Sequence, residues 1–184
     1  MTINLDWLGP FPLQDFFTVN ELKRKFAVPG VYIWIEDTPT GEHLSYVGKA
    51  SGSPPLFIRQ QQHYANMIGG LYTIPKCYRS ADFDWVPDWS KSDVAETLLD
   101  SDRFHQVVDD AFAYASHCAI YLAVLESAGQ TKLIERQLLY DLQPTGTRWG
   151  KSTLPGVPLS ITHHNAIWAT APIVAQARVL NLAE

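Results

Sequence analysis

The sequence predicts an α+β fold in which long helices flank a small three-stranded, mostly antiparallel sheet. Residues 30–36 are rich in the β-branched and aromatic residues typical of a buried strand, residues 43–48 follow as a second strand, and the apolar residues 119–125 are a third. Two longer segments, at 56–67 and 131–142, carry apolar residues at helical spacing. The order is strand, strand, helix, insertion, strand, helix. Two long helices on a small sheet give an α+β class.

The first two strands should form a hairpin. Residues 37–41 read Asp-Thr-Pro-Thr-Gly, a composition dense in turn formers. The predicted connection is a loop of about five residues. The third strand is apolar throughout, which indicates a central position or cover on both faces.

The helices have recognisable ends. Pro54 and Pro55 suit the first turn of a helix over 56–67, and Gly69-Gly70 would end it. The helix over 131–142 should stop before Pro144. A further helix is expected over 93–115, after a loop at 71–92 rich in Pro, Asp and Ser.

We expect a single domain over residues 1–184. Its core should span about 28–150, interrupted by an insertion at about 71–115 and followed by a C-terminal extension over about 151–184. Residues 1–29 are interpreted as a lead-in with a short helix at 19–26.

The composition excludes several classes of protein. Apolar residues make up 46% and charged residues 18%, which argues against a disordered or fibrous chain. No apolar run approaches the roughly 18 residues of a membrane span, and no basic lead-in marks a secretory signal. Cys77 and Cys118 fit neither a metal site nor a disulfide framework, which favours a cytoplasmic location.

The charge distribution is uneven. The net charge is −5, which is unlike most nucleic-acid-binding domains. Residues 71–115 contain nine acidic and four basic residues, so this segment carries the whole net charge. The remainder is neutral and leaves room for a locally basic face.

An ordered set of residues carries the chemistry. Gly30-Val31-Tyr32 opens the first strand, and Tyr46-Val47-Gly48-Lys49 closes the second. Arg59 and His63 are one turn apart on the next helix and share a face. Glu135 lies on the helix that follows the third strand.

This set resembles the GIY-YIG nuclease family over about residues 30–147, with 71–115 as an insertion. The resemblance implies a metal-dependent endonuclease that hydrolyses phosphodiester bonds in nucleic acid, expected to be DNA. One Mg²⁺ or Mn²⁺ ion would be the cofactor. Such hydrolysis needs an activated water and a cation on the phosphate oxygens.

The resemblance also implies a role for each residue. Tyr32 would be the base or position the attacking water, and Tyr46 would contact the phosphate. Arg59 would stabilise the transition state, His63 would assist proton transfer, and Glu135 would bind the metal. Lys49, Arg148 and Lys151 are candidate phosphate contacts, and Gly30 and Gly48 would be backbone requirements.

One position departs from the family pattern. The family carries an asparagine where this chain has Thr147, whose hydroxyl replaces only part of an amide's hydrogen bonding. Together with the acidic balance, this departure leaves open a catalytically weakened nucleic-acid-binding module on the same fold. The net charge of −5 and the insertion leave open a second alternative, an interaction protein in a larger assembly. No membrane partner is expected, while a homodimer or a partner protein stays open. His163 and His164 are expected to be surface residues.

Overall fold

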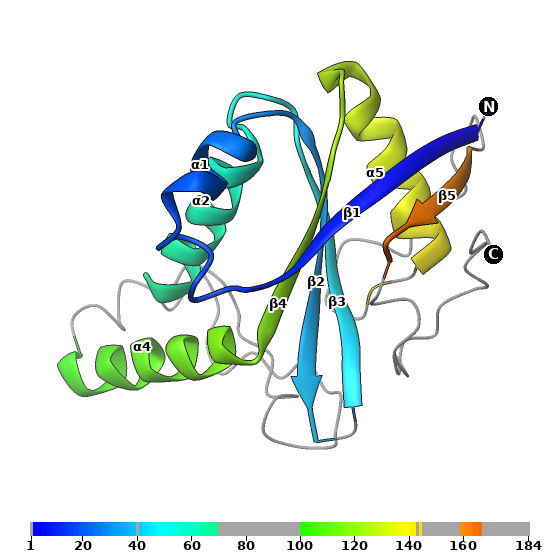
Figure 1. The fold of residues 1–184 in the computed structure, drawn as a ribbon. Coiled ribbons are helices and arrows are strands. Elements are labelled where there is room, and N and C mark those ends of the chain that lie inside the picture. Colours follow the sequence, from blue (N-terminus) through cyan, green and yellow to red (C-terminus); the bar gives the residue numbers. More distant parts are fainter. Residues whose placement is uncertain (1, 40, 70–99, 143, 145–158, 167–184) are drawn as a thin grey trace.

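The computed structural model describes residues 2–39, 41–69, 100–142, 144 and 159–166. Their elements follow the order β1 (Thr2–Pro12), α1 (Asn20–Lys25), β2 (Gly30–Thr38), β3 (Gly41–Ala50), α2 (Leu56–Ile68), α4 (Ser101–Ser116), β4 (Cys118–Val124), α5 (Ala128–Leu142) and β5 (Ser160–His164). Figure 1 shows a curled sheet with α1, α2 and α4 toward one side and α5 on the other.

The prediction of a three-stranded, mostly antiparallel sheet is wrong, although the α+β class holds. The sheet has five strands in the order β3-β2-β4-β1-β5. The pairs β2–β3, β2–β4 and β1–β4 are antiparallel, whereas β1 and β5 run parallel, so the sheet is mixed. Two strands thus come from segments outside the predicted core, the lead-in and the C-terminal extension.

The first strand was missed because Gly9-Pro10 interrupts it. The register between β1 and β4 shifts between Leu8 and Phe11, so the irregular stretch accommodates a proline that cannot donate to the ladder. On the other side of β1, the short strand β5 pairs with Thr2 through Asp6. Within the described residues, β1 therefore lies inside the sheet.

The other elements are close to prediction. The hairpin of β2 and β3 is present, but Asp37 and Thr38 continue β2, so the connection is shorter than expected. Helix α2 lies where predicted, whereas α5 ends where predicted but begins three residues earlier, at Ala128 instead of Thr131. Of the expected helix at 93–115, α4 covers Ser101 onward, and the rest lies outside the described residues. None of the described helices is long and apolar enough to cross a membrane.

Each face of the sheet has its own apolar core. Tyr32, Trp34 and Leu122 belong to the cluster that packs with α2 and α4. Val31, Ile33 and Ala123 belong to the cluster that packs with α5 and β5. Strands β2 and β4 are therefore covered on both faces, which explains their continuous apolar sequences.

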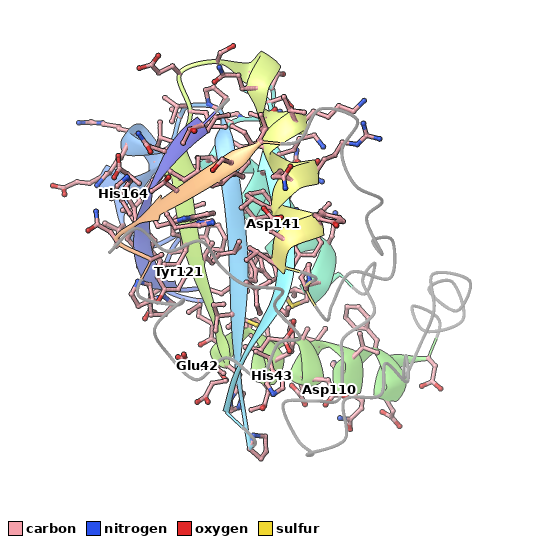
Figure 2. All side chains as sticks on the ribbon, turned by 90° about the vertical axis from the view of Figure 1, so that its right-hand side faces the viewer. Glu42, His43, Asp110, Tyr121, Asp141 and His164 are labelled. Carbon is pink, nitrogen blue, oxygen red and sulfur yellow. The ribbon has the colours of Figure 1, made fainter. Side chains whose placement is uncertain are left out.

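Residue Gln137 ties α5 to the start of β5. The backbone N–H of Leu159 donates to Gln137 Oε1 at 2.9 Å, and Gln137 Nε2 donates to Asp141 Oδ1 at 2.8 Å. Figure 2 views the molecule from this side and labels Asp141 on α5 and His164 on β5. These contacts connect the C-terminal half of α5 to Leu159, the residue that precedes β5.

Candidate active site

A pocket of about 200 Å³ lies at the C-terminal end of β3, the outermost described strand on its side of the sheet. Side chains from both faces can meet around such an edge. The pocket is lined by Tyr32, Tyr46, Lys49, Ala50, Ser51, Ser53, Pro54, Arg59 and Glu135. Strands β2 and β3 and helices α2 and α5 thus bring four of the five predicted catalytic residues, together with Lys49, to one place.

The fifth residue, His63, lies behind Tyr32 rather than in the pocket lining. The Tyr32 hydroxyl is 2.6 Å from His63 Nε2, and both side chains are buried. Burial, opposed in part by the Arg59 charge, raises the pKa of Tyr32 well above its usual value. Burial and then the Arg59 charge lower the pKa of His63 to about 3. Both groups are therefore neutral near pH 7.

Glu135 reaches the pocket from α5 and forms an ion pair with Lys49. Both side chains are only partly exposed, at 17% for Glu135 and 30% for Lys49. One turn earlier on α5, Thr131 Oγ1 lies 3.2 Å from Ser51 Oγ, at the end of β3. These two contacts fix α5 against β3 and orient the Glu135 carboxylate.

The Tyr32 ring packs directly over Gly48, where the absence of a side chain leaves room for it. A Cβ atom at Gly48 would overlap the Tyr32 ring and its hydroxyl. The ring also stacks on Tyr46, with centroids 6.0 Å apart and planes inclined by 25°. At the start of β2, a Cβ at Gly30 would overlap the carbonyl oxygen of Ala123. Both glycines are backbone requirements, as the sequence predicted.

The pocket has the charge pattern of an anion site. Lys49 and Arg59 are cationic, and Glu135 is the acidic residue in its lining. Within the described ranges, no three His, Cys, Asp or Glu side chains gather in a way that could hold a metal ion. A single carboxylate still suits Mg²⁺, which often takes one or two protein carboxylates and completes its shell with water and phosphate oxygens.

Some predicted residues fall outside the described part of the chain. These are Arg148 and Lys151, the candidate phosphate contacts, and Thr147, which stands where the family pattern has an asparagine. Other pocket residues were missed by sequence reasoning, notably Ser51 and Ser53. Their signal was the small polar stretch Ser51-Gly52-Ser53 between the hairpin and α2.

A scan against protein-family models, a search of curated proteins and a search of solved structures each returned no match to this chain.

Proposed function

We propose that this protein is a divalent-metal-dependent endonuclease that hydrolyses phosphodiester bonds in DNA. The supporting observation is the convergence of Tyr32, Tyr46, Arg59 and Glu135 on one pocket from four different elements. If these residues served only core packing or solvation, nothing would require them to line the same pocket beside two cationic side chains. Their order in the sequence also resembles that of the GIY-YIG nucleases.

The cationic groups would bind the scissile phosphate. The planar Arg59 guanidinium suits two phosphate oxygens, and Lys49 adds a mobile positive charge. The half-buried Tyr46 would donate its hydroxyl to a third oxygen. Glu135 would hold one Mg²⁺ or Mn²⁺ ion, which would polarise the phosphate when bound. For this, Lys49 must release the carboxylate and move to the phosphate.

The buried pair of Tyr32 and His63 would accept the proton of the attacking water. As the water oxygen forms its bond to phosphorus, its proton passes to the Tyr32 oxygen, and the Tyr32 proton passes to His63 Nε2 across the 2.6 Å contact. The bond from phosphorus to the leaving oxygen breaks, and that oxygen takes a proton from solvent. A neutral His63 is required at the start, because only an unprotonated nitrogen can accept.

The Lys49–Glu135 ion pair favours a second candidate. If Lys49 keeps the carboxylate occupied, the same pocket would bind a nucleic-acid phosphate without cleaving it. This protein would then be a binding module on a nuclease fold.

Nicking of supercoiled plasmid in Mg²⁺ or Mn²⁺ separates the candidates. We expect cleavage by the wild type, its loss in Glu135→Gln, and its retention in Glu126→Gln, which removes an exposed glutamate outside the pocket. Salt-dependent DNA binding without nicking would favour the binding module. Nicking that survives Glu135→Gln would refute the assignment of this pocket.

A further inference from the structure

Three aromatic rings surround the His63 imidazole. The ring centroids of Tyr32, Trp34 and Tyr46 lie 5.7, 5.6 and 5.5 Å from that of His63. Each ring is steeply inclined to the imidazole, at 66°, 74° and 66°, so the contacts are edge to face. Such a surround excludes water and resists rotation of the imidazole.

Trp34 differs from the two tyrosines because it has no place in the pocket lining. Its indole Nε1 donates a hydrogen bond of 2.8 Å to Gln60 Oε1. Gln60 is fully buried and lies one turn before His63 on α2. The indole of Trp34 therefore contacts two residues on the same helix face, one by a hydrogen bond and one through its ring.

We propose that Trp34 and Gln60 form a positioning pair that fixes His63 as a neutral imidazole with Nε2 turned toward the Tyr32 hydroxyl. Gln60 fixes the Trp34 indole by accepting its hydrogen bond, and the indole packs against the imidazole beside the two tyrosine rings. In this arrangement the phenol donates to Nε2, and the ring proton lies on Nδ1. The catalytic consequence rests on the proposed nuclease function, but the positioning itself does not.

The groups that face His63 are compatible with this role. The Tyr32 phenol from β2, the Tyr46 phenol from β3 and the Arg59 guanidinium from α2 are among them. Burial raises the pKa of the Tyr32 phenol well above its usual value, so that phenol is neutral near pH 7, and the Arg59 charge opposes a second positive charge on His63. Both the surround and the charge therefore favour the neutral ring.

Nitrogen-15 NMR of the histidine rings tests the proposal, with the His63 signal assigned by its loss in His63→Gln. We expect the wild type to show His63 neutral, with the proton on Nδ1, down to about pH 5. In Trp34→Phe and in Gln60→Leu the ring should take both neutral tautomers or titrate at higher pH. The double variant removes donor and acceptor together, so it should recover stability relative to Gln60→Leu without recovering the single tautomer.

A matched control is Trp7→Phe. It also removes a buried indole hydrogen bond, from Trp7 Nε1 to His163 Nδ1 at 3.0 Å, but Trp7 belongs to the apolar cluster on the other face of the sheet. This control should leave the His63 signal unchanged. An unchanged His63 tautomer and titration in both Trp34→Phe and Gln60→Leu would overturn the proposal, as would a proton on Nε2 in the wild type.

The cleavage assay adds a second readout. We expect the two single variants to lose on the order of tenfold to a hundredfold in rate, with a shifted pH profile, because general acid–base catalysis contributes about 10²–10⁴-fold. Altered His63 signals in a protein without nuclease activity would refute the proposed function alone. Unaltered signals in an active nuclease would refute the positioning pair alone.

Discussion

The Lys49 ammonium of β3 pairs with the Glu135 carboxylate of α5 at the rim of the pocket. The two residues are far apart in the sequence and come from elements that contact each other, an edge strand of the sheet and a helix that covers it. The carboxylate is therefore oriented before any ion arrives. Lys49 also competes with a metal ion for the Glu135 carboxylate, because an incoming cation must displace the ammonium.

Lys49→Met should strengthen metal binding and weaken DNA binding. Removal of the competing ammonium frees Glu135, and a partly exposed pair of this kind stabilises by at most about 1 kcal/mol, which corresponds to a gain of a few fold in Mn²⁺ affinity. Titration of Mn²⁺ by electron paramagnetic resonance measures the first effect and DNA titration the second. Lys132→Met, at an exposed position on α5 outside the pocket, should change neither.

Arg59→Ala should raise the pKa of His63 from about 3 toward its ordinary value. Burial is the larger cause of the low value and persists in the variant, so the recovery should be partial. Bound phosphate should act in the same direction in the wild type, since it compensates the Arg59 charge. NMR titration of the His63 ring with and without inorganic phosphate measures both effects. A fall in the pKa of His63 in Arg59→Ala would contradict the assigned electrostatics.

Acid should destabilise the fold through His163. Burial and then the neighbouring His164 lower the pKa of His163 to about 4 in the folded protein, against 6.5 when unfolded. The unfolded state therefore binds the proton more readily, so this stabilisation is complete above about pH 6.5 and is lost between pH 6.5 and 4. The loss is on the order of 3 kcal/mol.

The measurement is the free energy of unfolding in urea as a function of pH. His163→Gln keeps an acceptor for the Trp7 indole but cannot titrate, so its curve should fall less steeply over this range. His105→Gln, at an exposed position on α4, should reproduce the wild-type slope. Equal slopes in the wild type and His163→Gln would show that another group causes the acid sensitivity.

Gly48→Ala should displace Tyr32. The new methyl group would overlap the phenol, and relief of such overpacking costs about 1–3 kcal/mol of stability. Thermal unfolding should show the loss, and the ring signals of His63 should shift because the Tyr32 contact lengthens. Gly129→Ala is the control, since its Cβ would make only an ordinary contact in α5 and should leave both observables near wild type or slightly stabilise the helix.

Local sequence predicted the elements that carry the site. Residues 30–36 have strand composition, Pro54-Pro55 marks the start of α2, and Arg59 and His63 follow at helical spacing, so these assignments needed no distant contact. Strands β1 and β5 could not be found in this way. Their pairing joins Thr2 to Ser160 and Asp6 to His164, at separations no local pattern encodes.

The site shows the same division. The order of the motifs pointed to Tyr32, Arg59 and Glu135 as candidate site residues. It did not predict how deeply each side chain is buried. His63 lies behind the pocket because the Tyr32 ring stands between them, and Gln60 is buried in a stretch of three glutamines that looks solvated in sequence. His163 was expected at the surface and is buried, since β5 places its ring beside Trp7.

The most direct test of the central claim is paramagnetic line broadening by Mn²⁺ in the presence of a DNA duplex whose linkages resist hydrolysis. We predict that the signals of Tyr46, Ser51 and Arg59 broaden together. The signal of Glu42, which lies seven residues from Lys49 along β3 and hence about 23 Å away, should stay much sharper (Figure 2). Broadening centred near Glu42, or the absence of any localised broadening, would contradict a pocket that holds one ion and one phosphate.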